Sequence, residues 1–254
     1  MANKIDFNCD MGESFGMYKM GLDEEVIKHI SSANIACGFH AGDPTWMRRT
    51  IRLAEEHGVA VGAHPSFPDL VGFGRRNMAV SPEEARDDLV YQIGALQAFT
   101  RDKKLQHVKP HGAMYNRAVN DSELARAICE ALAEVDAGMA LVALAGSQWV
   151  SVANEMGVRV AREIFADRAL NPDGTLVSRS QPGAVLENVD QVVEQSLAMV
   201  TQGLATAIDG TKIEVQADSL CIHGDTPGAV EMAATLRREL ESAGVTVAPL
   251  GELV

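Results

Sequence analysis

The sequence has few aromatic residues, few cysteines and no long hydrophobic run. Phe, Trp and Tyr make up 5% of the 254 residues, so the core must be built from aliphatic side chains. The four cysteines (Cys9, Cys37, Cys129, Cys221) form no CxxC pair, which argues against a local zinc or redox motif. The longest apolar run, MALVALAG, is too short to span a bilayer. The amino terminus, MANKIDFNCD, lacks the apolar segment of a signal peptide, and we therefore expect a cytoplasmic protein.

Positive charge is also scarce. The chain has 22 Lys and Arg against 35 Asp and Glu, which gives a formal net charge of −13. Such a surface repels polyanions at long range, so we expect neither nucleic acid nor an anionic membrane as a partner. A small anionic substrate is not excluded, because a few well-placed Arg or Lys side chains can hold it.

The common nucleotide-binding and serine-nucleophile signatures are missing from the sequence. There is no GxxxxGK[ST] phosphate loop, no GxGxxG turn and no GxSxG elbow. We therefore do not expect this chain to bind a nucleotide by itself or to use a catalytic serine.

The sequence does contain a regular alternation of short β-branched segments and longer amphipathic segments. This alternation predicts an α/β fold with a parallel sheet covered by helices. Seven such units in 254 residues predict one domain, residues 1–254, folded as a seven-stranded parallel (β/α) barrel. The predicted strands are 5–9, 33–37, 59–63, 107–109, 140–145, 159–166 and 219–222. The predicted helices are 23–31, 44–57, 82–102, 122–136, 147–156, 189–207 and 227–243.

Several helix starts carry capping signals. In SPEE, Ser81 stands at the cap, Pro82 at the first helical position and Glu84 at the third, which is a capping box. Asn188 in NVDQ has the same role. In GDP, Asp43 precedes a proline, so we interpret it as a helix cap rather than a catalytic residue.

Polar residues gather where the predicted strands end. In a parallel barrel all strand exits lie on one face, where active sites are built. Any one of these residues alone is more simply read as a structural side chain. Together they favour a functional pocket. The residues are Asp10 and Glu13 after the first strand, His40 after the second, His64 after the third, Lys109 and His111 at the fourth, Asp167 and Arg168 after the sixth, and His223 and Asp225 after the seventh.

These residue types support two kinds of chemistry. Asp10, His40 and His64 would suit a divalent metal with a bound water. Alternatively, carboxylate and imidazole groups share protons without a metal. Lys109 is a candidate for stabilising an oxyanion or a substrate carboxylate, and its simpler reading is a buried ion pair with an aspartate.

Arginines in two Gly/Pro-rich stretches complete the set of candidates. Arg75 and Arg76 lie in GFGRRN, and Arg179 lies in SRSQPG. An arginine can bind a carboxylate or phosphate through two hydrogen bonds. At least one of Arg75 and Arg76 is equally well explained as a solvated surface residue.

Seven segments together resemble one known family. They are DFNCDMGESFG, SANIACGFHAGDP, VGAHPSFPDLVGFGRRNM, VKPHGAMYN, EIFADRAL, DGTLVSRSQPGAV and CIHGDTPGA. In this order they are similar to the LamB/YcsF family of 5-oxoprolinase A subunits, and the resemblance runs essentially from end to end. It implies a distorted TIM-like barrel of seven strands, distantly related in architecture to metal-dependent carbohydrate deacetylases and of the glycoside hydrolase/deacetylase type.

The resemblance also implies ATP-dependent opening of 5-oxo-L-proline to L-glutamate together with B and C subunits. ATP would then be handled partly or wholly by those subunits, which fits the missing phosphate loop. The candidate catalytic residues are Asp10, Glu13, Lys109, His111, Asp167 and His223. The candidate substrate-binding residues are Arg75, Arg168, Arg179 and Asp225, and the candidate metal ligands are Asp10, His40 and His64.

Two other functions remain open at this point. One is an amide hydrolase or deacetylase that uses a divalent metal and no ATP. The other is a regulatory or binding module without catalysis, which would not need a proton-transfer group on one face of the barrel. A homo-oligomer is also compatible with the sequence.

Overall fold

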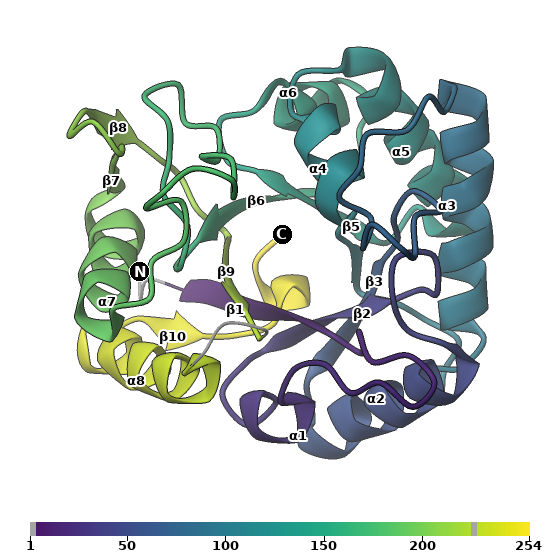
Figure 1. The fold of residues 1–254 in the computed structure, drawn as a ribbon, viewed down its shortest axis with the longest axis horizontal. Coiled ribbons are helices and arrows are strands. Elements are labelled where there is room, and N and C mark those ends of the chain that lie inside the picture. Colours follow the sequence, from purple (N-terminus) through teal and green to yellow (C-terminus); the bar gives the residue numbers. More distant parts are fainter. Residues whose placement is uncertain (1–3, 225–227) are drawn as a thin grey trace.

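The computed structural model describes residues 4–224 and 228–254 (Figure 1). The predicted site residue Asp225 lies outside the described residues. Within the described residues, no helix is long and apolar enough to cross a membrane.

A closed barrel of seven parallel strands forms the centre of the molecule, as the sequence predicts. The strands follow one another in chain order around the barrel, and the last of them pairs with both its predecessor and the first. Helices surround the barrel on the outside (Figure 1). The barrel strands are β1 (Lys4–Met11), β2 (Ser32–Ala36), β3 (Ala60–His64), β4 (His107–Val108), β5 (Ala140–Leu144), β6 (Val160–Phe165) and β9 (Ser219–His223).

The helices largely follow the predicted pattern. Three predicted helices are too long: α1 is a single turn, α3 ends before residue 98, and α7 passes into a π-helix, Ala198–Gln202, instead of running to residue 207. The helices are α1 (Asp23–Val26), α2 (Pro44–His57), α3 (Pro82–Gln97), α4 (Gly112–Ala118), α5 (Ser122–Asp136), α6 (Gln148–Glu155), α7 (Val189–Leu197) and α8 (Ala229–Ser242).

Four short elements are absent from the sequence prediction. Helix α4 begins directly after His111. Strands β7 (Leu204–Thr206) and β8 (Lys212–Glu214) form a separate antiparallel hairpin. Strand β10 (Thr246–Val247) pairs with the start of β1 outside the closed barrel. These elements have seven residues or fewer, so they present too few turns or alternations for a periodic pattern to be visible.

The predicted helix caps are present. The hydroxyl of Ser81 accepts a hydrogen bond from the backbone N–H of Glu84, and the Glu84 carboxylate accepts one from the N–H of Ser81. Asn188 accepts from the N–H of Gln191. Asp43 accepts from two backbone N–H groups at the start of α2, so it is a helix cap, as predicted.

The two faces of β1 differ in chemistry. Phe7 and Cys9 belong to the apolar core between the barrel and its helices. Asp6, Asn8 and Asp10 alternate with them and make hydrogen bonds to side chains of other barrel strands. Successive strand residues face opposite sides of a sheet, so the polar residues of β1 point into the barrel.

The interior of this barrel is a hydrogen-bonded polar network rather than stacked aliphatic layers. Asn8 donates to Glu163 on β6 and to Ser219 on β9. Asn34 on β2 donates to Asn8 and lies 2.7 Å from a ring nitrogen of His107 on β4. The network connects five strands. It ends at the carboxyl ends of the strands, where the candidate functional site lies.

Candidate functional site

A cavity of about 540 Å³ opens where the barrel strands end. It is lined by residues from both halves of the chain, as expected when consecutive strand exits share one face of a barrel. Strand register brings the first and last strands together here, because Asp10 on β1 lies opposite Asn34 on β2 and His223 on β9. Nine predicted site residues line the cavity: Asp10, Glu13, His64, Arg75, Lys109, His111, Arg168, Arg179 and His223.

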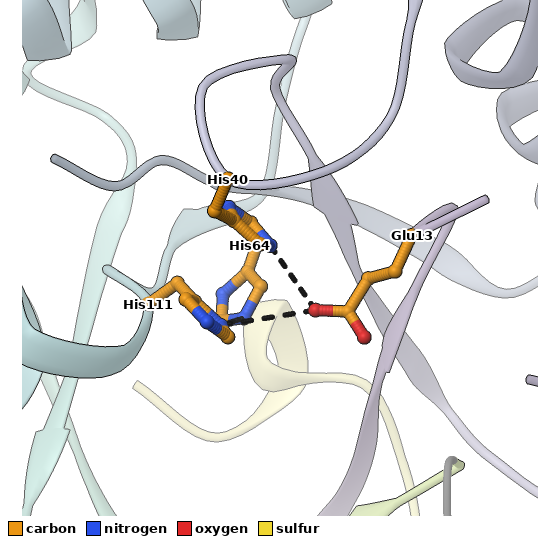
Figure 2. A group of neighbouring side chains, drawn as sticks. All are labelled: Glu13, His40, His64 and His111. Carbon is orange, nitrogen blue, oxygen red and sulfur yellow. Dashed lines mark hydrogen bonds and ion pairs between the residues drawn. The ribbon is translucent and has the colours of Figure 1, made fainter. Parts of the chain in front are cut away.

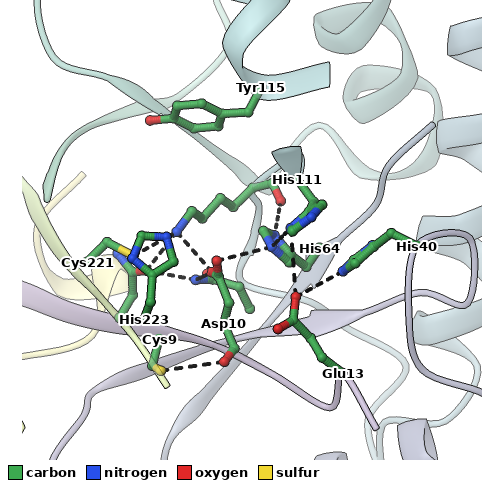
Figure 3. A network of polar contacts seen from close by, with 12 residues as sticks. Cys9, Asp10, Glu13, His40, His64, His111, Tyr115, Cys221 and His223 are labelled. Atoms are coloured by element: carbon green, nitrogen blue, oxygen red, sulfur yellow. Dashed lines mark hydrogen bonds and ion pairs between the residues drawn. The ribbon is translucent and has the colours of Figure 1, made fainter. Parts of the chain in front are cut away.

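Lys109 lines the floor of the cavity and contacts Asp10 and Cys221, two residues of the polar network that Figure 3 labels. Its Nζ atom lies 2.9 Å from Asp10 Oδ1 and 3.0 Å from Glu163 Oε1. It also lies 3.0 Å from Cys221 Sγ and 3.3 Å from Asn8 Oδ1. Burial opposes the positive charge, but the adjacent carboxylates outweigh it and hold the pKa of Lys109 well above its usual value. Lys109 is therefore a fixed cation and not a base.

Asp10 joins this floor to a group of histidines. Its Oδ1 accepts hydrogen bonds from Lys109 and from Asn34 Nδ2, the latter at 2.8 Å. Its Oδ2 lies 3.3 Å from His64 Nε2. Burial would raise the pKa of Asp10, but His64 and Lys109 hold it well below its ordinary value. Asp10 is thus an ionised carboxylate and a weak base.

Three imidazoles, of His40, His64 and His111, gather on one side of the carboxylate of Glu13 (Figure 2). Glu13 Oε1 lies 3.1 Å from His40 Nε2 and 3.7 Å from His111 Nδ1. The rings of His40 and His111 stack with centroids 3.8 Å apart, and His64 meets both edge-on. Burial and the neighbouring imidazoles lower the pKa values of His40 and His111 well below the usual range, so both rings are neutral.

The turn that carries Glu13 depends on glycine. Gly12 has a φ of +69°, a conformation that side chains rarely adopt, and its N–H donates to Asp23 Oδ2. A Cβ atom at this position would lie 3.1 Å from the Ile35 side chain. The close turn lets the chain reverse directly after β1 and place Glu13 over the end of the barrel.

On the opposite side of the cavity, Asp167 orients His223. His223 Nδ1 lies 2.9 Å from a carboxylate oxygen of Asp167, which is fully buried. A carboxylate only accepts hydrogen bonds, so Nδ1 carries the proton and Nε2 is the nitrogen left for the cavity. Burial opposes the charge of Asp167, but the contact with His223 holds the pKa of Asp167 below its usual value. This pair is a carboxylate–imidazole dyad suited to proton transfer.

The arginines have different roles. Arg168 donates to the backbone carbonyls of Val177 and Ala184, so it fixes the long loop that covers one side of the cavity. Burial, followed by the nearby Arg179, lowers the pKa of Arg168 to about 10. Arg75 lies over the ring of Phe73 at the cavity rim. Arg76 instead pairs with Asp69, and its side chain is 66% exposed, which fits the prediction that one of the two arginines is a surface residue.

Comparison with known proteins identifies the family. The sequence pattern that defines the LamB/YcsF family matches residues 5–254. The chain belongs to the LamB/YcsF family. Its relatives include a protein of Thermococcus onnurineus named as the A subunit of 5-oxoprolinase, which is 57% identical over 253 residues, with 99% of each chain covered. The same name is carried by a Pyrococcus furiosus protein that is 56% identical over 253 residues, again with 99% of each chain covered.

A solved structure agrees with this family assignment. A lactam utilization protein from Thermus thermophilus superposes with a TM-score of 0.91 at 49% identity, covering 96% of this chain and 99% of the other. The barrel of this LamB/YcsF protein is therefore shared with a solved relative that is 49% identical.

The predicted site residues of this LamB/YcsF protein form three groups according to where they lie. Nine line the cavity. His40 and Asp167 stand behind it and contact Glu13 and His223 respectively. Asp225 lies outside the described residues.

Sequence reasoning missed the inner part of the site. Glu163 on β6 contacts Lys109, and the hydroxyl of Tyr115 on α4 donates to Glu163 at 2.8 Å. Asn8 and Cys221 also contact Lys109. These residues lie within strands or on a short helix rather than at strand exits. The available signal was polar alternation along β1, which marks an inward polar face, and a lone glutamate inside the apolar strand AREIFA.

Proposed function

We propose that this chain is the A subunit of an ATP-dependent 5-oxoprolinase, which opens the lactam ring of 5-oxo-L-proline to L-glutamate together with B and C subunits. The observation that carries the proposal is the Asp167–His223 pair facing a cavity that also holds a buried lysine and three arginines. Relatives more than 50% identical carry the name of a 5-oxoprolinase, which supports the choice of substrate.

The reaction requires an activated carbonyl, a base and donors for a tetrahedral oxyanion. A five-membered lactam is an unstrained amide, so coupling to ATP, through phosphorylation of the amide oxygen, makes its carbonyl open to attack. Water then adds to this carbon, and the C–N bond breaks as the ring nitrogen takes a proton, which leaves an acyl phosphate. A second water cleaves the acyl phosphate to the carboxylate of glutamate and free phosphate. The partner subunits would supply the ATP chemistry, because the sequence of this chain has no phosphate loop.

His223 is our choice for the proton-transfer group. Asp167 fixes its tautomer, so Nε2 can take a proton from the attacking water and return it to the leaving nitrogen. Asp10 is a poorer base, because His64 and Lys109 keep its pKa very low despite burial.

The cations have separate tasks in this proposal. Lys109 has four polar neighbours around its Nζ atom, so it holds Asp10 and Glu163 in position rather than reaching the substrate. Arg75 and Arg179 line the cavity and are suited to hold the substrate carboxylate or the phosphate. Arg168 fixes the loop that carries Arg179.

The dyad can be tested in the reconstituted complex. His223→Gln and Asp167→Asn should each lower glutamate formation from 5-oxoproline by roughly 100- to 10,000-fold, the usual contribution of acid–base catalysis. His57→Gln, a substitution on the exposed end of α2, is the matched control and should leave the rate unchanged.

Two results would contradict the proposal. Wild-type rates in both folded dyad variants would remove His223 from the chemistry. Turnover of lactams or acetylated sugars by the isolated chain without ATP would favour a simple amide hydrolase instead.

A further inference from the structure

The hydrogen bonds around His64 and His111 fix where their protons lie. His64 Nδ1 is 2.6 Å from the backbone carbonyl oxygen of Lys109. His111 Nε2 is 2.9 Å from the carbonyl oxygen of Phe73. A carbonyl only accepts, so each of these nitrogens carries a proton and donates it. When both rings are neutral, His64 Nε2 and His111 Nδ1 therefore present lone pairs.

Those two lone-pair nitrogens face each other. His64 Nε2 and His111 Nδ1 are 2.9 Å apart, within hydrogen-bond distance. Two acceptors cannot bond to each other, so the arrangement requires a positively charged species between them. That species is either a shared proton or a metal ion.

Two carboxylate oxygens converge on the same place. Asp10 Oδ2 is 3.3 Å from His64 Nε2, and Glu13 Oε1 is 3.7 Å from His111 Nδ1. Tetrahedral coordination with bonds near 2.0–2.1 Å places neighbouring ligand atoms roughly 3.3 Å apart. The observed separations of 2.9, 3.3 and 3.7 Å lie around this value. We infer that Asp10, Glu13, His64 and His111 form a binding site for one divalent transition-metal ion.

Carboxylate groups lie beside the two facing nitrogens. Those of Asp10 and Glu13 are nearly buried, with exposed side-chain fractions of 9% and 12%. Carboxylate oxygens attract a divalent cation, and burial strengthens this attraction because less water screens it. The two carboxylates therefore add oxygen ligands to the two imidazole nitrogens.

The surrounding contacts have the form of an outer ligand shell. His40 Nδ1 is buried without a partner among the described residues, so the ring proton lies on Nε2 and is donated to Glu13. Asn34 and Lys109 occupy Oδ1 of Asp10 and leave Oδ2 toward His64. Outer partners of this kind orient metal ligands. His40 is thus a positioning residue. Compared with the ligands predicted from the sequence, Asp10, His40 and His64, the proposed set contains Glu13 and His111 in place of His40. The donor set of two imidazoles and two carboxylates suits Zn²⁺ or Mn²⁺.

The site can be tested on the isolated full-length chain with the metal alone. The chain is purified without metal-affinity steps, stripped with a chelator, and titrated with Zn²⁺ and Mn²⁺ in a calorimeter. We expect one ion per chain. His64→Asn and His111→Asn should abolish this stoichiometric binding, and His40→Asn should weaken it by roughly 10- to 100-fold. The matched control His57→Asn changes an exposed histidine on α2 and should bind as the wild type does.

Circular dichroism establishes that each variant is folded. Glu13→Gln provides a milder ligand change at the cavity rim if a histidine variant does not fold, and it should also weaken binding. A wild-type chain that takes up neither ion in stoichiometric amounts would overturn the inference and leave a shared proton between the imidazoles. Wild-type affinity in the folded ligand variants would overturn it as well.

Discussion

At the residue scale, Lys109 links the structural interior of the barrel to the functional site. Its ammonium group lies between Asp10 at the cavity and Glu163 inside the barrel. Breaking a buried ion pair by removing one partner leaves an uncompensated charge in a low-dielectric environment. The stability of the barrel and the geometry of Asp10 therefore depend on the same side chain.

Lys109→Met should lower the free energy of unfolding by about 3–5 kcal/mol, because two buried carboxylates lose their cation. Adding Glu163→Gln should recover part of this loss, since one of the two charges is then removed. Lys4→Met, which breaks the exposed pair with Glu252, is the control and should change stability by less than about 1 kcal/mol. Urea unfolding of the four proteins measures the effect. A double variant that is no more stable than Lys109→Met would contradict this account of Lys109.

Asp6 makes stability depend on pH. Burial raises its pKa to about 6, and hydrogen bonds from Ser219, Ser32 and Ser31 only partly oppose the shift. The folded state therefore binds the proton more tightly than the unfolded chain does. Proton binding by Asp6 therefore adds to the free energy of unfolding. This contribution is fully present below the unfolded pKa of Asp6, near 3.8, and is lost as pH rises through the folded pKa of about 6.

The difference in unfolding free energy between wild type and Asp6→Asn should therefore change with pH. The wild type should lose about 2 kcal/mol relative to the variant between pH 4 and pH 7. Urea unfolding at several pH values gives the difference directly. A constant difference over this range would show that Asp6 titrates in the folded state as it does in the unfolded chain.

At the scale of elements, strong periodicity and capping determined what the sequence predicted. All seven barrel strands and the starts of α2, α3 and α7 were found, because their apolar patterns and caps are local signals. The end of α7 was not, since the segment after Leu197 keeps an apolar pattern while its backbone widens into a π-helix and then enters β7. That change depends on packing against the rest of the molecule, which a local pattern does not contain.

The loops after β3 and β4 touch through their backbones. Gly112 has a φ of +56°, and a Cβ atom there would lie 2.5 Å from the carbonyl oxygen of Gly74. That carbonyl also accepts the hydrogen bond from the N–H of Ala113 that seats the start of α4. The contact holds His111, the residue before Gly112, in the site.

Gly112→Ala should therefore destabilise the protein more than Gly58→Ala does. Gly58 also has a positive φ, but a Cβ atom there meets nothing within 4 Å, so this matched control carries only backbone strain of about 1 kcal/mol. Thermal unfolding compares the two variants. Equal losses would mean that the two loops move apart easily and that the backbone contact does not hold His111.

At the scale of the whole molecule, barrel topology explains why residues far apart in the sequence form one site. Polar residues at strand exits could be predicted to converge, because parallel strands of a barrel end on one face. Glu163, Asn8 and Tyr115 could not be predicted. The contacts of Glu163 and Asn8 with Lys109, and of Tyr115 with Glu163, depend on which elements lie opposite each other across the barrel. The tautomers of His64 and His111 likewise follow from carbonyl positions that no sequence motif specifies.

The most direct test of the central claim is glutamate formation from 5-oxo-L-proline by the purified subunits. The proposed function predicts that this chain together with the B and C subunits forms glutamate and consumes ATP, and that B and C without it do not. The His223→Gln chain should assemble with its partners and leave the reaction close to the rate without this chain. A complete complex that forms no glutamate from 5-oxoproline, or B and C subunits that do so equally well alone, would contradict the account.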